Sequence, residues 1–479
     1  MTQILMKLNG GTVEIANAKL TGLESSLHGR LIGKKDAGYD DARSLWNGMI
    51  DRHPGLIVRA KDTSDIRLTV NFARENSLLL AVKGGGHQIA GHAVADGALL
   101  LDLSQMKGLL VDADAATVTV EPGCQLSDVD RETQIYGLAV PLGINSTTGI
   151  AGLTLGGGFG WITAKHGLTI DNLRSAQVVC ADGEVRVASA TQNADLFWAI
   201  RGGGGNFGVV SSFEFALHPI GPKVLSGLIV HPLADARGLL QSYREICARA
   251  PDELTIWTVM RKAPPLPFIP EVWHGKEVLI FAACYAGDMK EGEKALQELR
   301  DLGKPIADVI GPHPYAGWQQ AFDPLLTPGA RNYWKSHDFL NLPDKAIDIL
   351  LKALEALPDP QCEVFIARVG GAMARVPQGA TAFPQRKAHF VMNVHTRWED
   401  DAKDGDCMAW ARDLFAKTAA FSEGSAYVNF MPEDEAGRVG TAYGANMERL
   451  RQIKAKYDPR NLFQLNHNIV PLMGAQAAK

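Results

Sequence analysis

Residues Lys83 to Ala93, KGGGHQIAGHA, combine three consecutive glycines with two histidines. Because glycine has no Cβ atom, the backbone of Gly84, Gly85 and Gly86 can turn so that successive N–H groups converge on an anion such as a pyrophosphate. His87 follows directly, so its imidazole would lie beside the bound group as a base, a ligand or a covalent attachment point. The alternative is a simple tight turn next to a surface histidine.

A second glycine-rich stretch, TTGIAGLTLGGGFG at residues 147–160, favours ligand binding, since two such loops fit a large ligand with several phosphates. Its glycines do not give the GxGxxG fingerprint between a strand and a helix, so a nicotinamide-binding Rossmann domain is not indicated. For each single glycine, a close crossing of two strands remains the alternative interpretation.

Five segments in order resemble the flavin enzymes of the vanillyl-alcohol oxidase and p-cresol methylhydroxylase superfamily, in particular the berberine bridge enzyme-like oxidases. They are residues 31–66, the GGGH loop, the long glycine stretch, residues 195–215 (DLFWAIRGGGGNFGVVSSFEF) and residues 443–469 (YGANMERLRQIKAKYDPRNLFQLNHNI). The resemblance implies an α+β protein with a two-part FAD-binding domain of the p-cresol methylhydroxylase type. It also implies a substrate domain in which helices cover an antiparallel sheet.

Helices and strands predicted from local sequence patterns must hold the two glycine-rich loops in place. Residues 57–59 read as a strand, followed by a helix that Thr63 or Ser64 would cap, with Ile66, Val70 and Ala73 on one face. The next part is rich in strands, at residues 98–104, 108–123 and 175–189, and the last of these is a hairpin turning at Asp182-Gly183. Residues 125–137 read as the helix between them. Helices do not alternate with every strand, which argues against a doubly wound fold.

A second set of strands begins after Pro219, at residues 224–233, 254–263, 277–287, 362–374 and 389–400. Helical patterns lie between them at residues 236–251, 291–303 and 344–357, which predicts one antiparallel sheet covered by helices on one side. We therefore divide the chain into a lead-in (1–24), an FAD-binding domain (25–218), a substrate domain (219–422) and a C-terminal segment (423–479) that returns to the FAD-binding domain.

Composition excludes several other classes of protein. The 479 residues carry a net charge of −5 and show no basic block, so nucleic acid is not an expected partner. Six cysteines without a CxxC pair indicate neither a zinc site nor a disulfide framework, and the histidines show no metal-ligand spacing. No targeting segment and no run of eighteen apolar residues is apparent, so we expect a cytoplasmic monomer or homodimer that does not bind membranes.

The resemblance assigns the cofactor as FAD and His87 as the residue bonded to the flavin 8α carbon, with His92 as the rival attachment site. Many members of the family form a second bond from a cysteine four residues before the glycine equivalent to Gly149. Asn145 holds that position here, so we expect no cysteinyl bond, and Cys124 and Cys180 lie outside the motif. The other cofactor residues implied are Lys83, Gly84, Gly85, Gly86, Gly91, Thr147, Thr148, Gly149, Gly152, Gly157, Val209, Asn466 and Asn468.

The strand FVMNVHTRW presents Asn393 and His395 on one face and Met392 and Val394 on the other. Several members of the family carry a glutamate base at the position of Asn393, and an amide cannot take a proton from a hydroxyl. Tyr427 matches a family tyrosine that faces the flavin and would serve as the base if its pKa were lowered. His395 is the second candidate, and for both residues a purely structural role is the alternative.

The resemblance therefore predicts an FAD-linked oxidase that removes a hydride from a carbon bearing a hydroxyl or amine and passes the electrons to molecular oxygen. The substrate would be a small sugar, alcohol or amine. A dehydrogenase with a different electron acceptor and a flavin-binding protein without redox activity remain the alternatives.

Overall fold

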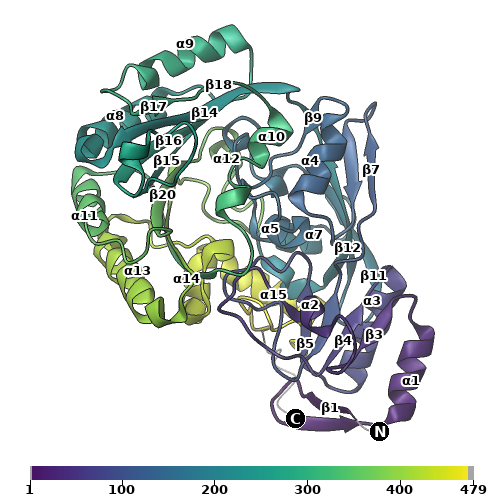
Figure 1. The fold of residues 1–479 in the computed structure, drawn as a ribbon. Helices are drawn as coiled ribbons and strands as arrows, with labels where there is room; N and C mark the ends of the chain where they lie inside the picture. Colours follow the sequence, from purple (N-terminus) through teal and green to yellow (C-terminus); the bar gives the residue numbers. More distant parts are fainter. Residues whose placement is uncertain (1–2, 473–479) are drawn as a thin grey trace.

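The computed structural model describes residues 3–472, in which two sheet-containing parts lie side by side (Figure 1). The N-terminal part contains a four-stranded sheet in the order β3-β4-β6-β5. Strands β4, β5 and β6 are parallel, and β3 pairs with β4 in the antiparallel sense. The strands are β3 (Arg30–Ile32), β4 (Leu56–Arg59), β5 (Leu80–Lys83) and β6 (Leu99–Asp102). The glycine loop thus leaves the end of β5.

Helix α3 (Thr63–Glu75) connects β4 to β5 and buries Ile66, Val70 and Ala73 completely, which confirms the predicted helical face. The prediction of its cap was wrong. The side chain of Asp62, and not that of Thr63 or Ser64, accepts the hydrogen bond from the N–H of Asp65. An aspartate carboxylate one residue earlier satisfies this free N–H group and also complements the positive end of the helix.

A second, fully antiparallel sheet follows in the order β11-β10-β12-β8-β7. Its strands are β7 (Leu109–Asp112), β8 (Thr117–Val120), β10 (Leu173–Val179), β11 (Val185–Ser189) and β12 (Val209–Ala216). The β10–β11 hairpin turns at Gly183, whose φ of 82° favours glycine, as predicted. Three helices flank this sheet: α4 (Leu126–Gln134), α5 (Ile150–Gly156) and α7 (Ala194–Ile200).

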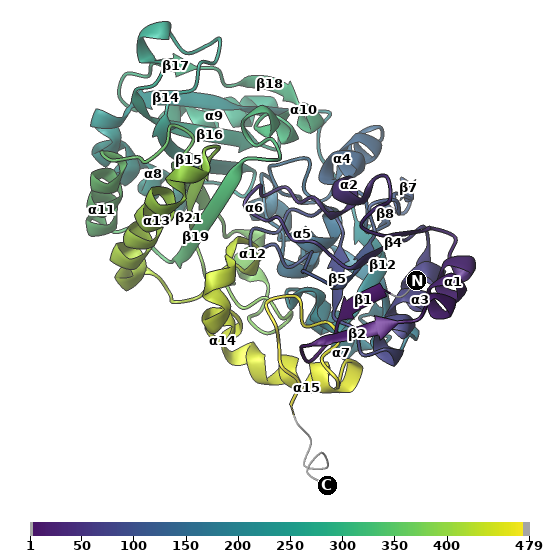
Figure 2. The ribbon, with the colours of Figure 1, turned by 60° about the horizontal axis from the view of Figure 1, so that its bottom comes forward.

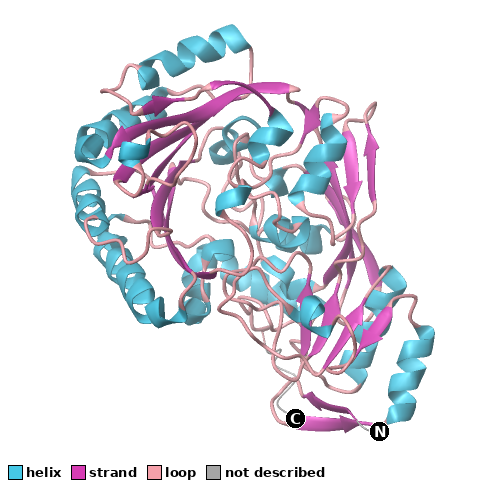
Figure 3. Cartoon of the chain, viewed as in Figure 1, coloured by secondary structure: helices cyan, strands magenta, loops and turns pink. Residues whose placement is uncertain are grey.

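The second part is an eight-stranded antiparallel sheet in the order β17-β14-β16-β15-β20-β21-β19, with β18 also paired to β14. Helices cover its outer face (Figure 3). They are α8 (Ala236–Arg249), α9 (Met289–Arg300), α11 (Asp344–Leu354) and α13 (Asp404–Thr418). The strands are β14 (Lys223–Pro232), β15 (Leu254–Lys262), β16 (Glu277–Tyr285), β17 (Ala307–Asp308), β18 (Gly311–Pro314), β19 (Arg331–Phe339), β20 (Glu363–Arg368) and β21 (Phe390–Trp398).

The alternation predicted for β21 is confirmed. Met392 and Val394 are fully buried in the core beneath the helices, together with Leu350 of α11 and Leu414 of α13. Asn393 and His395 face the other way, toward the N-terminal part. The sheet therefore exposes one polar-containing face to the space between the two parts.

The chain end returns to the N-terminal part through α15 (Met447–Tyr457), which lies beside α7 (Figure 2). Leu462 and Phe463 pack in one core cluster with Leu56 and Leu80. Within this turn the buried Lys454 amine lies 2.7 Å from the Asp458 carboxylate and donates to the carbonyl of Asn206.

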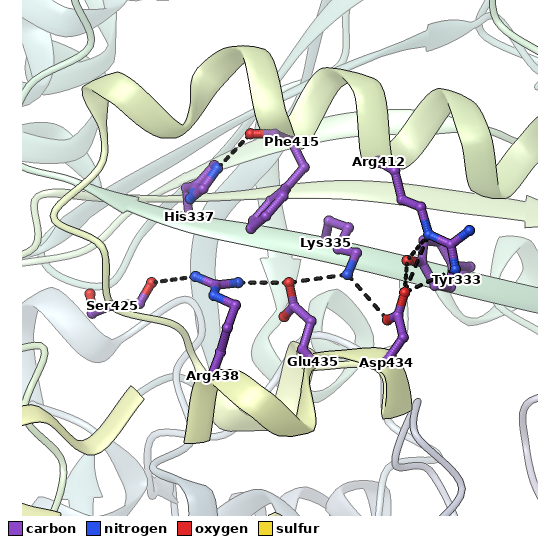
Figure 4. A network of polar contacts seen from close by, with 9 residues as sticks. All are labelled: Tyr333, Lys335, His337, Arg412, Phe415, Ser425, Asp434, Glu435 and Arg438. Atoms are coloured by element: carbon purple, nitrogen blue, oxygen red, sulfur yellow. Dashed lines mark hydrogen bonds and ion pairs between the residues drawn. The ribbon is translucent and has the colours of Figure 1, made fainter. Parts of the chain in front are cut away.

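A polar network joins β19 to the short helix η9 (Glu433–Arg438) (Figure 4). The Lys335 amine lies 3.1 Å from both Asp434 and Glu435, and the Tyr333 hydroxyl donates to Asp434 at 2.7 Å. Arg438 pairs with Glu435 at 2.6 Å and donates to the carbonyl of Ser425. These contacts fix the segment that carries Tyr427.

Residues 3–472 contain no helix that is both long and apolar enough to cross a membrane. All six cysteines lie in the interior as free thiols.

Candidate functional site

A cavity of about 340 Å³ lies between the glycine-rich loops and the face of the eight-stranded sheet that its helices leave uncovered. Its walls come from the loop after β5, from α5, from the loop before β12, from β15, β20 and β21, and from the C-terminal segment. Most of the residues predicted from the sequence line it: Gly84, Gly85, Gly86, His87, His92, Thr148, Gly149, Gly152, Val209, Asn393, His395, Tyr427 and Asn466.

Lys83, Gly91, Gly157 and Asn468, also predicted as cofactor residues, lie outside this lining. The Lys83 amine is buried, donates to the carbonyl of Ala42 and lies 3.7 Å from Asp102, so it supports the sheet. A Cβ at Gly91 would meet Ile50 at 2.8 Å, and one at Gly157 would meet Phe383 at 3.0 Å, so close packing explains both glycines.

The two glycine-rich loops cross at Gly85 and Gly149. A Cβ on Gly85 would lie 2.5 Å from backbone atoms of Gly149, and one on Gly149 would lie equally close to Gly85. The close-crossing interpretation therefore holds for this pair. Gly152 differs, because a Cβ there would meet nothing within 4 Å, although the residue lines the cavity.

Backbone donors are available in the first loop. Among residues 3–472, no protein group accepts from the N–H groups of Gly85, Gly86 and His87. These free N–H groups and the open space at Gly152 line the same cavity. Together they fit the phosphates of a dinucleotide, as the sequence predicts. The residues present therefore fit FAD.

His87 is held by a short relay. Its Nε2 lies 2.9 Å from the Thr147 hydroxyl, which donates to Asn145 Oδ1 at 2.7 Å. Because that hydroxyl has one hydrogen, Nε2 of His87 must be the donor to Thr147, and Nδ1 keeps a free lone pair. Burial lowers the pKa of His87 to about 3, so the imidazole is neutral and nucleophilic. Thr147 thus acts through His87 and is absent from the cavity lining.

His92 lines the same cavity and packs edge-on against His467, with ring centroids 5.1 Å apart. Burial, with a smaller effect from Arg52, lowers its pKa to about 4. His92 therefore presents a second neutral imidazole to the cavity. Cys124 and Cys180 are absent from the lining, and burial raises their pKa to about 12 and about 11 respectively, which describes inert core thiols.

Aromatic side chains form most of the opposite wall. Trp334 contacts His395 at a centroid distance of 4.8 Å and Phe430 at 5.6 Å, and Phe430 contacts Tyr427 at 4.9 Å. Further rings complete this wall, from the second glycine stretch, from the residue that follows it and from the eight-stranded sheet: Phe159, Trp161, Trp257 and Phe365. The site is therefore apolar, with a small number of polar groups.

Two of those polar groups form a buried pair. Nδ1 of His395 lies 2.8 Å from Oε1 of Glu363, and Oε2 of Glu363 accepts from Arg261 at 2.7 Å. Nε2 of His395 and both amide atoms of Asn393 are buried and have no partner among residues 3–472.

Tyr427, the first candidate base, lines the cavity. Its hydroxyl oxygen accepts from the N–H of Gly158 and from Asn429 Nδ2, both at 3.0 Å. These two contacts lower its pKa, but burial outweighs them and raises the pKa to about 12. The condition under which Tyr427 would serve as the base, a lowered pKa, is therefore not met in these surroundings.

Sequence reasoning missed Glu363, Arg261 and Trp46. Arg261 pairs in register with Glu363, and Glu363 with His395, across three adjacent strands. Aligning the predicted strands by their alternation would have placed these three side chains on one face. No comparable signal exists for Trp46, which reaches the site from an irregular segment.

His28, for which the sequence shows no metal-ligand spacing, lies near Asp62 and Asp65, with ligand atoms within 4.8 Å of one another. The Asp65 carboxylate accepts from the backbone N–H groups of His28 and Gly29, both at 2.9 Å. The cluster of His28, Asp62 and Asp65 is therefore explained by hydrogen bonds that hold the backbone at His28 and Gly29 in place.

Comparison with known families agrees with this geometry. A family profile described as "FAD binding domain" matches residues 54–189, which include His87 and Gly152. A second profile, "Berberine and berberine like", matches residues 426–470, which include Tyr427 and Asn466.

Full-length relatives extend the similarity. An FAD-linked oxidoreductase of Dictyostelium discoideum is 32% identical over 453 residues, covering 93% of this chain and 96% of that protein. The crystal structure of 6-hydroxy-D-nicotine oxidase from Arthrobacter nicotinovorans superposes with a TM-score of 0.84 at 27% identity, covering 93% of this chain and 99% of that one. Xylooligosaccharide oxidase from Myceliophthora thermophila shares the fold, with a TM-score of 0.82 at 24% identity over 94% and 99% of the two chains.

Proposed function

Since the chain belongs to the berberine bridge enzyme-like FAD-linked oxidoreductases, we propose that it carries FAD bonded to His87 and oxidises a hydroxyl- or amine-bearing carbon of a small molecule. Molecular oxygen is the proposed electron acceptor, and hydrogen peroxide the product. The observation that carries the proposal is the cavity that brings His87, the open space at Gly152 and the unpartnered polar atoms of Asn393 and His395 together.

FAD, when bound, supplies the ring that accepts a hydride from the substrate carbon. The protein supplies position and charge. The N–H groups of Gly85, Gly86 and His87 would hold phosphate oxygens, and the Asn145–Thr147 relay presents a neutral His87 for bonding.

For the substrate, the aromatic wall favours a flat apolar molecule over a sugar. Trp334, Phe365 and Phe430 can stack on a ring, whereas an oligosaccharide would need a polar partner for each of its hydroxyls. The name of the related 6-hydroxy-D-nicotine oxidase specifies a heteroaromatic substrate, which agrees with this preference. We propose an aromatic alcohol or a cyclic amine with an aromatic substituent.

Three measurements test the proposed function. Acid precipitation of the flavin-replete protein should leave a yellow pellet, and a colourless pellet would exclude a covalent bond. In a panel of aromatic alcohols, aryl-substituted cyclic amines and oligosaccharides, the first two classes should release hydrogen peroxide. Anaerobic reduction followed by air should restore the oxidised spectrum within seconds, and recovery over minutes would instead indicate a dehydrogenase.

A further inference from the structure

We propose that Glu363 and His395 together form the proton acceptor of this site, with Nε2 of His395 taking the substrate proton and Glu363 positioning the imidazole. The inference rests on the proposed function, because it concerns the proton that leaves when the hydride does. It adds a carboxylate that sequence reasoning did not find, and it shifts the role of base away from Tyr427.

The sheet itself builds this pair. Arg261 on β15, Glu363 on β20 and His395 on β21 stand side by side in register. Both carboxylate oxygens of Glu363 are engaged, one by His395 Nδ1 at 2.8 Å and one by Arg261 at 2.7 Å. Glu363 and His395 are 8% and 4% exposed, so their mutual orientation is fixed by packing and not by solvent.

The charge state follows from these contacts. Burial alone would raise the pKa of Glu363, but Arg261 and His395 together hold it below the ordinary value for a glutamate. An ionised carboxylate only accepts hydrogen bonds, so Nδ1 of His395 must carry the hydrogen that it donates to Glu363. Nε2 of the neutral ring then keeps its lone pair and acts as an acceptor.

Nε2 of His395 is free to accept a proton from a substrate. Nε2 of His395 is buried without a partner in the described part of the chain, and so are both amide atoms of Asn393, two residues earlier on the same strand face. The indole N–H of Trp334, whose ring lies edge-on to His395, is also unpartnered among these residues. Buried polar atoms are costly unless a ligand satisfies them, so their convergence in one cavity marks where the reacting group binds.

For an alcohol, the O–H bonding pair would become the second bond of the carbonyl and the proton would bond to Nε2 of His395. Bound FAD would supply the acceptor of the C–H bonding pair, which leaves the substrate carbon as a hydride. The resulting imidazolium lies against the Glu363 carboxylate, which stabilises it. An amine gives the corresponding imine by the same transfers.

Tyr427 is the weaker acceptor. Its oxygen already accepts two hydrogen bonds, and its pKa of about 12 keeps it protonated at neutral pH. Other titratable or charged groups also face the cavity and contribute to any pH profile: Arg261, His87, His92, His467 and Tyr443.

The test uses anaerobic flavin reduction by whichever panel compound reduces the wild type, followed from pH 5 to pH 10. We expect His395→Gln to slow reduction by about a hundredfold to ten-thousandfold and to abolish the rise of the rate on the acid side. Glu363→Gln should slow the plateau and move that acid-side inflection to lower pH, because the imidazolium loses its anion. Glu399→Gln, which removes an exposed carboxylate just after β21, is the matched control and should change neither.

Flavin content and melting temperature identify a variant that does not fold. If a variant does not fold, binding of 4-nitrophenol to the proteins that do fold tests, without turnover, whether the Glu363–His395 pair accepts a proton. The neutral and ionised forms of this probe differ in colour. The wild type should bind it as the phenolate at a pH where the free probe is largely neutral, and Glu363→Gln should bind it as the phenol. An unmoved inflection in Glu363→Gln, a His395→Gln rate within threefold of the wild type, or a probe that stays neutral in the wild type would each overturn the proposal. Reduction by no panel compound, with the phenolate still formed, would instead count against the proposed function alone.

Discussion

The indole of Trp46 stacks on the imidazole of His87, with ring centroids 4.6 Å apart and planes inclined by 23°. Trp46 also contacts Trp334 at 5.7 Å, and Trp334 contacts His395 at 4.8 Å. A continuous row of rings thus connects the proposed site of flavin attachment to the proposed base. Arg397 lies over the Trp46 ring at 5.6 Å and adds a cation–π contact to this row.

Replacing Thr147 should impair flavin attachment. Thr147→Val keeps the shape of the side chain but removes the hydroxyl that orients His87, so the fraction of covalently bound flavin should fall severalfold. Thr147→Ser keeps the hydroxyl and should retain attachment. Flavin fluorescence of the denatured protein on a gel measures the bound fraction. Equal fluorescence in the valine and serine variants would show that the relay has no part in attachment.

Tyr427→Phe should mainly affect stability. The change leaves the buried N–H of Gly158 without its acceptor, which costs about 1–3 kcal/mol of unfolding free energy. The rate of flavin reduction should drop by less than the roughly hundredfold expected for losing a base. Thermal unfolding and stopped-flow reduction check the two parts. A rate loss above a hundredfold, with unchanged stability, would return the role of base to Tyr427.

The network between β19 and η9 should matter for stability. Lys335→Met removes a buried amine from Asp434 and Glu435, and breaking a buried ion pair on one side costs about 3–5 kcal/mol. Lys417→Met breaks an exposed pair with Asp413 on α13 and should change stability by no more than about 0.5 kcal/mol. Melting temperatures compare the two, and similar values for both variants would contradict this account.

Asp130 should make stability depend on pH. Burial raises its pKa from the ordinary 3.8 to about 7, although a hydrogen bond from Gln319 lowers it in part. Between these two values the folded protein keeps a proton that the unfolded chain releases, so stability falls as the pH rises from about 4 to about 7. The loss is on the order of 4 kcal/mol.

Asp130→Asn removes this titration, so the difference between melting temperatures at pH 5 and pH 8 should shrink. A pH dependence identical to that of the wild type would show that Asp130 does not titrate in this range.

Local patterns predict the fold where neighbours in sequence determine the structure. The buried face of α3, the β10–β11 hairpin at Gly183 and the alternation along β21 all follow from spacing or turn chemistry. Strand β19 could not be predicted from such a pattern, because its sequence RNYWKSHDF mixes charged residues with aromatic ones. The partners that satisfy Lys335 lie about a hundred residues later, on η9.

The sequence also predicts only part of the candidate site. The glycine motifs identify the loops, and most of the predicted residues meet at one cavity. Tertiary contacts decide the rest: the Lys83 amine turns to the carbonyl of Ala42, and burial sets the pKa of Tyr427. Glu363 becomes visible only once the register of β20 against β21 is known.

The intact masses of the denatured wild-type protein and of His87→Ala test the proposed bond between the flavin and His87. We expect the denatured wild type to carry the added mass of one FAD, and His87→Ala to bind FAD in its native state but lose it on denaturation. A His87→Ala protein that keeps the added mass would contradict the assignment of His87, and a wild type without it would contradict covalent attachment altogether.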